Sequence, residues 1–281
     1  MSEWKRILVI GAGNIGGALI GGMLASGVSS REHLVALETN EARAEEVREK
    51  WGIEVATAGG TELIERADVV ILAVKPLTLP RVLRDIRDVL RPDQILISVA
   101  AAFPIDLIEK IIRKPVPVFR AMPNIPVVVG EGATGLAANA TVTEEHRKFV
   151  ESIFRSAGAV CNVEEDLMHA VTALSGSGPA YIYMVIEALI AGGVKMGLSQ
   201  QVSTRLAEQT VLGAAKLVRE TMLHPAILKD RVTTPGGVTI AAIHELERHG
   251  LRAMLISAVE TATSQSRKLT QSLRAKVEEE L

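Results

Sequence analysis

Residues Ile7 to Ala25 read ILVIGAGNIGGALIGGMLA, and this stretch decides the fold of the first half of the chain. Ile7 to Ile10 is a short, wholly apolar run, as expected of a central parallel strand that is buried on both faces. A GxGxxG sequence follows at once, and Ile15 to Ala25 reads as a helix. In this context the first glycine permits a tight turn, the second lets a pyrophosphate approach the backbone, and the third allows close packing of helix on strand. The stretch predicts a dinucleotide-binding βαβ unit.

An acidic residue, Glu38, ends the next predicted strand, Leu34 to Leu37. Its distance from the glycines fits the carboxylate that accepts hydrogen bonds from an adenosine ribose about 20 residues further on. Such a carboxylate would repel a 2′-phosphate, so Glu38 taken alone favours NAD over NADP. The alternative is a solvated glutamate at the head of the acidic helix Glu41 to Lys50.

Further helices and strands alternate after this unit. Helices are predicted near Gly59 to Arg66, over Leu79 to Leu90 and over Thr143 to Ser156, and strands at Asp68 to Val74, Gln94 to Val99, Val116 to Ala121, Gly132 to Ala138 and Ala159 to Val163. This alternation implies right-handed crossovers and a doubly wound parallel sheet, an α/β fold of Rossmann type over residues 1–163. Ligands of such sheets bind beyond the carboxyl ends of the strands. Ala73-Val74-Lys75-Pro76 and Val99-Ala100-Ala101-Ala102 are therefore expected beside the cofactor.

Residues 164–281 contain no convincing strand and predict an all-α second domain. Its helices are expected at Asp166 to Leu174, Pro179 to Met196, Ser199 to Glu220, Gly237 to His249 and from Leu251 to the C-terminus. Few apolar positions between Ile182 and Ile190 could face water, so a partner subunit is expected to cover them. The sequence therefore predicts an obligate homodimer.

The stretch Arg231 to Glu247, RVTTPGGVTIAAIHELE, predicts a second ligand site. Pro235 can fix one backbone angle, Gly236 and Gly237 can adopt conformations closed to other residues, and a helix begins directly after them. The first amides of a helix have no internal acceptors, so such a start attracts anions. The alternative is an ordinary turn capped by Thr234.

Composition excludes several classes of function. The 281 residues suggest two domains, and the net charge of −2 with a pI near 6.3 leaves no basic field for nucleic acid. Cys161 is the only cysteine, which argues weakly for a reducing compartment, so a cytoplasmic location is the default. The apolar run Ile7 to Ile10 is too short for a signal peptide. Ala170 to Val194 is long enough to span a bilayer, but Gly176 to Pro179 should divide it into two shorter helices of a core or a subunit interface.

Two other kinds of catalytic site are set aside. His244 and His249 lie five residues apart on a predicted helix instead of four, so they point to different faces and no metal site is implied. No Gly-x-Ser-x-Gly nucleophile elbow occurs, and Ser175 and Ser177 lie in a strandless region, which makes serine hydrolysis improbable.

With these motifs laid out, the chain resembles the pyrroline-5-carboxylate reductases, and the resemblance extends over nearly its whole length. It rests on Gly11 to Gly16, Ala73 to Pro76, Arg120 to Pro126 (RAMPNIP), Leu174 to Tyr181 (LSGSGPAY) and, above all, Val232 to Ile240 (VTTPGGVTI). The resemblance implies a Rossmann domain followed by an interwoven helical dimer domain, and it allows an oligomer of dimers, since such oligomers are common in the family. It also implies that Thr239 hydrogen-bonds the ring nitrogen of the substrate and that Gly236 to Thr239 hold its carboxylate.

Two sets of site residues are predicted from the motifs and the resemblance together. The cofactor set is Gly11, Ala12, Gly13, Asn14, Ile15, Gly16, Glu38, Ala73, Val74, Lys75, Pro76, Ala100 and Ala101. The substrate set is Glu165, Arg231, Val232, Thr234, Gly236, Gly237, Val238 and Thr239, with Thr239 as the catalytic residue.

Three positions depart from the pattern of the family. Thr234 stands where serine is usual, Ala102-Phe103-Pro104 replaces the more usual Gly-Val-Thr, and Glu38 stands where relatives that prefer NADPH tend to have small, hydroxyl-bearing or basic residues. The cofactor is therefore predicted only as NADP or NAD, with Glu38 favouring NADH.

The predicted reaction is reduction of the cyclic imine 1-pyrroline-5-carboxylate to L-proline by hydride transfer, the last step of proline biosynthesis. Water, Thr239 and Glu165 are all candidates for the proton donor. Two alternatives are a β-hydroxyacid-type dehydrogenase and a protein that senses dinucleotides without turnover. The dehydrogenases carry a catalytic lysine soon after a Gly-x-Gly, where this chain has Tyr181-Ile182-Tyr183.

Overall fold

The apolar runs of the first half of the chain pair into one eight-stranded sheet. In the computed structural model, which describes residues 5–280, the strand order is β3-β2-β1-β4-β5-β6-β7-β8. The strands are β1 (Ile7–Ile10), β2 (Leu34–Leu37), β3 (Glu54–Ala56), β4 (Val69–Leu72), β5 (Ile95–Ser98), β6 (Val118–Met122), β7 (Gly132–Ala138) and β8 (Gly158–Asn162). The six strands β1 to β6 pair in parallel, whereas β7 pairs antiparallel to β6 and parallel to β8. The predicted Rossmann-type sheet is confirmed.

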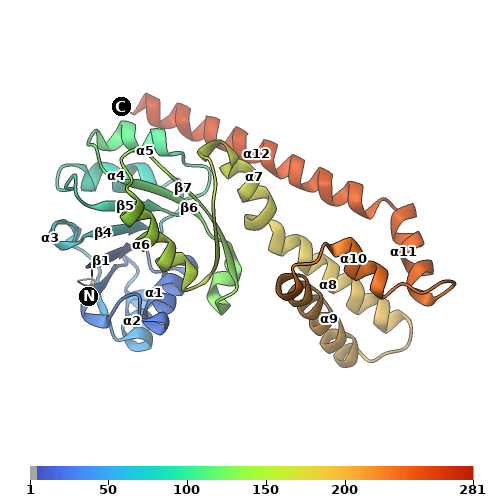
Figure 1. The fold of residues 1–281 in the computed structure, drawn as a ribbon. Coiled ribbons are helices and arrows are strands. Elements are labelled where there is room, and N and C mark those ends of the chain that lie inside the picture. Colours follow the sequence, from blue (N-terminus) through green and yellow to red (C-terminus); the bar gives the residue numbers. More distant parts are fainter. Residues whose placement is uncertain (1–4, 281) are drawn as a thin grey trace. The chain divides into compact units, whose positions relative to one another are not determined.

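Helices cover both faces of this sheet, as the doubly wound architecture requires (Figure 1). Alternate residues of each central strand point to opposite faces, so Leu8 and Ile10 enter one core while Ile7 and Val9 enter the other. The covering helices are α1 (Asn14–Ser26), α2 (Glu41–Trp51), α3 (Gly60–Arg66), α4 (Leu79–Arg87), α5 (Ile105–Ile112) and α6 (Glu144–Arg155). Because both faces of the sheet are apolar and covered by helices, a polar ligand is expected to bind at the ends of the strands.

The sequence interpretation missed three short elements. β3 has three residues and α5 has eight, so neither is long enough for a clear periodic pattern. The third, α10 (Pro225–Arg231), begins with proline at its first turn and has seven residues. The segment 166–174, predicted as one helix, consists of the end of a 3₁₀ turn, η3 (Glu165–Leu167), then α7 (Met168–Val171), and the start of a π-helical turn, η4 (Thr172–Gly176).

The second half of the chain is helical, as predicted. It contains α8 (Gly178–Lys195), α9 (Gln200–Thr221), α10, α11 (Val238–Arg248) and α12 (Leu251–Glu279). The contacts divide the chain into a first unit, residues up to Ser177 with those from Glu260, and a second unit, Gly178–Val259. This division differs from the predicted boundary after residue 163, because Met168, Leu273 and Val277 are buried in the core of the first unit.

One helical stretch, Glu165–Lys195, is long and apolar enough to cross a membrane by length and composition alone. The π-helical turn and Ser177 interrupt it before α8, close to the predicted break at Gly176 to Pro179. No residue of α8 is buried within this chain, so its apolar side chains require a cover from outside the chain.

Candidate functional site

The loops that follow β1, β4 and β5 emerge at one edge of the sheet. The Ala73 amide donates to the Ile10 carbonyl over 2.8 Å, and the Val99 amide donates to the Leu72 carbonyl over 3.1 Å. On the other side of β1, the Gly11 amide donates to the Leu37 carbonyl over 2.8 Å. The structure therefore brings the predicted cofactor residues of these loops to the same edge.

The three fingerprint glycines are required for different reasons. Gly11 has φ of +94°, and a Cβ there would lie 2.6 Å from the Ala73 carbonyl oxygen. A Cβ on Gly16 would collide with the Gly11 carbonyl oxygen. Gly13, in contrast, has an ordinary φ of −71°, and a Cβ there would meet no atom within 4 Å. The fold therefore requires Gly11 and Gly16, whereas only a ligand that approaches the backbone closely would require Gly13.

Glu38 is buried at the end of β2, so the alternative of a solvated glutamate is wrong. Its side chain accepts hydrogen bonds from the Ala12 amide over 3.0 Å and from the Asn40 amide over 2.9 Å. The guanidinium of Arg43 lies 3.5 Å from one carboxylate oxygen. The carboxylate thus ties the glycine loop to the start of α2 and keeps a negative charge beside it.

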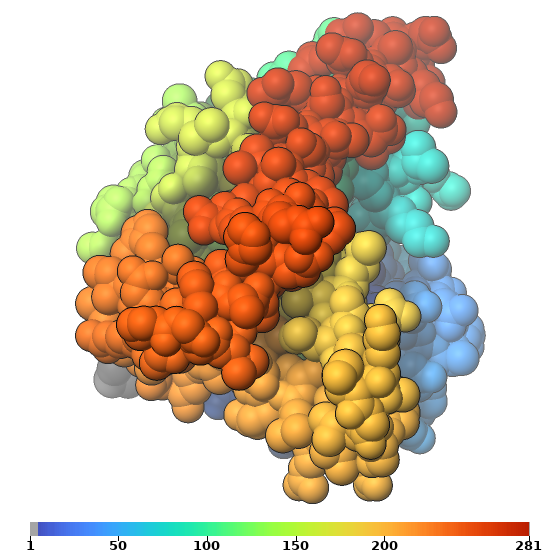
Figure 2. Space-filling model, turned by 90° about the vertical axis from the view of Figure 1, so that its right-hand side faces the viewer, coloured from blue at the N-terminus to red at the C-terminus, as the bar shows by residue number. Residues whose placement is uncertain are grey.

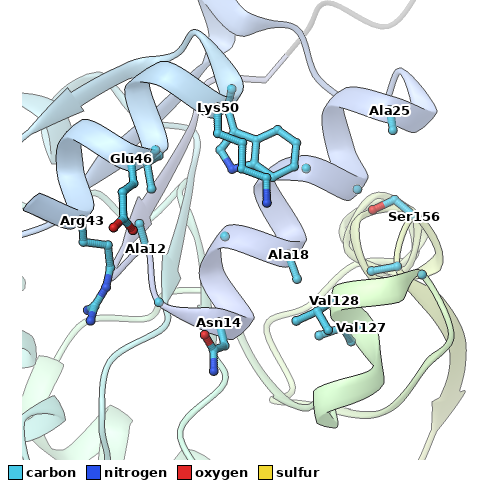
Figure 3. A pocket seen from close by; sticks show the side chains of 18 residues that line it. Ala12, Asn14, Ala18, Ala25, Arg43, Glu46, Lys50, Val127, Val128 and Ser156 are labelled. Carbon is cyan, nitrogen blue, oxygen red and sulfur yellow. The ribbon is translucent and has the colours of Figure 1, made fainter. Parts of the chain in front are cut away.

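A groove of ≈ 460 Å³ extends from the glycine loop along α1 (Figure 3). Small residues of α1 form one side, and Arg43, Glu46 and Lys50 of α2 lie beside them. Val127 and Val128 of the 3₁₀ helix η2 (Ile125–Val129) form the opposite wall. Gly13 lies at this groove, which leaves room for a ligand at its backbone.

The other predicted cofactor residues lie at the same edge. Ala100 is buried, and its amide donates to the Ser98 hydroxyl over 3.3 Å. After β4, Ala73, Val74 and Pro76 are half-buried, whereas the Lys75 side chain is exposed. These loops present mainly backbone and small side chains, which fits the close approach of a nicotinamide ribose.

Glu165, predicted at the substrate, makes its observed contacts within the first unit. One of its carboxylate oxygens lies 2.8 Å from the guanidinium of Arg120 and accepts a hydrogen bond from the Ile105 amide over 3.1 Å. Arg120 is buried on β6, and sequence interpretation gave it no role of its own, although a single cation inside an apolar strand is itself a signal. Burial, and then the positive charges of Arg120 and Arg267, lower the pKa of the nearby His169 below its ordinary value.

The remaining predicted substrate residues lie together in the second unit, at the start of α11. Gly236 has φ of +67°, and a Cβ on Gly237 would collide with the Thr234 hydroxyl. Gly237 is the N-cap residue, and no side chain among the described residues caps this helix, so the alternative of a Thr234 cap is wrong. Val238 is 90% exposed, and the segment lies at the molecular surface (orange in Figure 2). The first amides of α11, including that of the half-buried Thr239, are thus available to an anion.

Within residues 5–280, no group of three or more His, Cys, Asp or Glu side chains could hold a metal ion.

The fold and the glycine loop place the chain in the class of Rossmann-type dinucleotide-binding proteins. Comparisons with known proteins identify its family within this class. A family model described as pyrroline-5-carboxylate reductase dimerisation matches residues 165–269, and one described as NADP oxidoreductase, coenzyme F420-dependent, matches residues 6–102. The pyrroline-5-carboxylate reductase of Methanosarcina acetivorans is 41% identical over 267 residues, which cover 95% of this chain and 98% of that protein. That of Escherichia coli is 37% identical, with coverage of 95% and 99%.

Solved structures agree with these relatives. A pyrroline-5-carboxylate reductase from Coxiella burnetii matches with a TM-score of 0.90 and 37% identity, over 95% of this chain and 99% of that one. The Plasmodium falciparum enzyme, whose structure has NADP bound, matches with a TM-score of 0.84 and 30% identity, over 95% and 98%. The chain belongs to the pyrroline-5-carboxylate reductase family, as its motifs predicted.

Two single replacements of fingerprint glycines distinguish a glycine required for ligand binding from a glycine required for folding. We expect Gly13→Ala to leave the thermal unfolding midpoint of the ligand-free protein unchanged, because its Cβ enters open space, and to weaken dinucleotide binding at least about tenfold. Gly16→Ala should instead lower the midpoint or prevent folding, because its Cβ meets the Gly11 carbonyl. NADPH and NADH fluorescence titrations and thermal scans measure both effects. Unimpaired binding by Gly13→Ala would show that no ligand approaches this residue.

Proposed function

We propose that this protein reduces 1-pyrroline-5-carboxylate to L-proline with a nicotinamide dinucleotide. The proposal is carried by family membership at 41% identity over 95% of the chain. Two sites support it, one for a dinucleotide at the glycine loop and one for an anion at the start of α11. In the reaction a hydride adds to the carbon of the C=N bond and a proton adds to its nitrogen, while the dinucleotide is oxidised.

The second unit supplies the proposed substrate contacts. The amides of Val238 and Thr239 bind the substrate carboxylate, because the start of α11 carries donors without an acceptor in the helix and the positive end of the helix dipole, whereas the Gly237 amide donates to the Thr234 carbonyl and closes the turn. The Thr239 hydroxyl hydrogen-bonds the ring nitrogen and sets the orientation of the imine. Arg231, Val232 and Thr234 are proposed as further substrate contacts of the second unit. Glu165, which lies beside Arg120 in the first unit, is also proposed as a substrate contact.

The first unit supplies the proposed cofactor contacts. Bound NAD(P)H supplies the hydride. Gly11 to Gly16 hold the pyrophosphate at the start of α1, and Glu38 faces the adenosine ribose. Ala73 to Pro76 and Ala100 with Ala101 hold the nicotinamide half. Correct placement of donor and acceptor carbons makes the step effectively unimolecular, an effect worth about 7 to 11 kcal/mol at best.

We propose NADH as the preferred cofactor. The Glu38 carboxylate is held in place by two amides, and it would repel a 2′-phosphate. The guanidinium of Arg43 lies 3.5 Å from the same carboxylate, and its positive charge would act against this repulsion.

We further propose that the working form is a cytoplasmic homodimer without membrane or nucleic-acid partners. The exposed apolar side chains of α8, among them Ile182, Tyr183 and Met184, support a partner subunit as their cover. Residues 1–163 and 164–281 are proposed as the cofactor domain and the substrate and dimerisation domain.

An absorbance assay with 1-pyrroline-5-carboxylate tests the reaction and the role of Thr239 together. We expect NAD(P)H oxidation by the unaltered protein, and a fall in kcat of about 100-fold for Thr239→Ala, because a donor aimed at the reacting atom is removed. The dinucleotide dissociation constants should stay within about twofold. Thr239→Ser retains the hydroxyl and should remain active. Dinucleotide binding without turnover by the unaltered protein would instead favour a sensing role.

Cofactor preference tests the placement of Glu38. We expect Glu38→Ser to raise the ratio of kcat/KM for NADPH over NADH roughly tenfold, because two like charges about 4 Å apart repel by roughly 1 kcal/mol even in bulk water. Glu41→Ser, which removes an exposed carboxylate from the first turn of α2, should leave the ratio unchanged. An unaltered ratio for Glu38→Ser would show that Glu38 does not face the ribose.

Light scattering tests the proposed dimer. We expect a mass of twice the 30.1 kDa chain for the unaltered protein. Met184→Glu, which introduces a charge on the apolar surface of α8, should shift the mass toward that of one chain. Lys148→Glu on α6 changes an exposed residue of the first unit and should have no effect. A monomer at every concentration of the unaltered protein would contradict the dimer.

A further inference from the structure

The loop between β5 and α5, residues 99–104, has an unfavourable backbone conformation at its centre. Ala102 has φ of +59°, in the left-handed region, and its side chain is buried. Alanine disfavours this region because its Cβ approaches the following carbonyl oxygen. Surrounding contacts must therefore hold the loop in this shape.

Thr270 of α12 provides the first of these contacts. Its hydroxyl donates to the Ala102 carbonyl oxygen over 2.7 Å, and both residues are buried. The end of α12 lies beside α5 (Figure 1), where Arg274 pairs with Asp106 and Lys110 with Glu278. Leu273 and Val277 of α12 are buried in the same core as residues of α5, which holds Thr270 within reach of the residue with the positive φ.

Glu165 and Arg120 provide the second contact, at the other end of the loop. The Ile105 amide is among the first amides of α5 and has no acceptor within the helix. Glu165 accepts its hydrogen bond over 3.1 Å and so caps α5 from a segment about 60 residues away. The buried guanidinium of Arg120 holds that carboxylate in place over 2.8 Å. The second terminal nitrogen of Arg120 and the second carboxylate oxygen of Glu165 are buried without a hydrogen-bond partner among the described residues.

We infer that Thr270, together with the Arg120–Glu165 pair, fixes the loop that places Ala100 and Ala101 against the nicotinamide, and that Thr270 is a positioning residue for hydride transfer. This inference rests on the proposed function, because it assigns the loop to the cofactor. Thr270 acts on the loop through its hydrogen bond to the Ala102 carbonyl. Loss of its hydroxyl leaves a buried carbonyl oxygen without that donor and allows Ala102 to leave the left-handed region.

Thr270→Val tests this role, since valine keeps the shape of threonine and removes only the hydroxyl. We expect kcat for 1-pyrroline-5-carboxylate reduction to fall about tenfold, within the roughly 100-fold loss that a 1 Å misplacement can cause. KM for the imine should change less than about twofold, because the start of α11, which is proposed to bind its carboxylate and ring nitrogen, lies in the second unit. Thr270→Ser restores the hydroxyl and should restore kcat.

Hydrogen–deuterium exchange of the ligand-free proteins provides a second measurement that does not depend on activity. We expect residues 99–105 to exchange at least about tenfold faster in Thr270→Val than in the unaltered protein or Thr270→Ser, with unchanged exchange in β1 and α1. Unaltered loop exchange, an unaltered kcat, or a general increase of exchange throughout the first unit would overturn the inference. If the unaltered protein does not reduce the imine, the proposed function fails, while the exchange result still decides whether Thr270 fixes the loop.

Discussion

The parallel pairing of β1 with β2 and β4 is the constraint on which the rest of the candidate site depends. Ile10 is in register with Leu37 on one side and with Leu72 on the other, so the three strands end together. Their buried faces accept only apolar residues, and polar ligands are therefore confined to the strand ends. Each of three segments directly follows one of these strands: the glycine loop follows β1, Glu38 follows β2, and a further loop follows β4. The hydrogen-bonded pairing of the strands therefore brings all three segments to the same edge of the sheet.

Two carboxylates, the buried Glu38 and the partly buried Glu165, stabilise that edge in similar ways. Glu38 accepts the Ala12 and Asn40 amides, and Glu165 accepts the Ile105 amide beside Arg120. A buried charge is costly unless it is paired and hydrogen-bonded. Both carboxylates meet this condition by holding the backbone of a loop that the cofactor is proposed to contact. Their structural role, which is to fix a loop, is therefore compatible with their proposed role in the site, because a fixed loop holds its backbone groups where the cofactor is proposed to bind.

Much of the fold could be predicted from the sequence because its signals are local. The strand, turn and helix over Ile7 to Ala25 follow from an apolar run and glycine spacing, and β7 was predicted at its observed bounds, Gly132–Ala138. Short elements such as β3 and α5 were not predicted from the sequence, because segments of three and eight residues show too little hydrophobic periodicity. The family was also predictable, because its motifs are continuous segments in both halves of the chain.

By itself, then, the sequence determined the Rossmann-type sheet, the helical second half, the family and the glycines that a dinucleotide needs. Only the tertiary structure decided which of these glycines the fold itself requires, that Glu38 is buried, and that Glu165 pairs with Arg120. It alone brought Thr270 to Ala102, 168 positions apart in the chain. The physical reason is the distance along the chain over which each kind of interaction acts. Backbone propensity and hydrophobic periodicity act within a few residues, whereas burial, ion pairs and the support of a strained loop arise only when distant segments pack together.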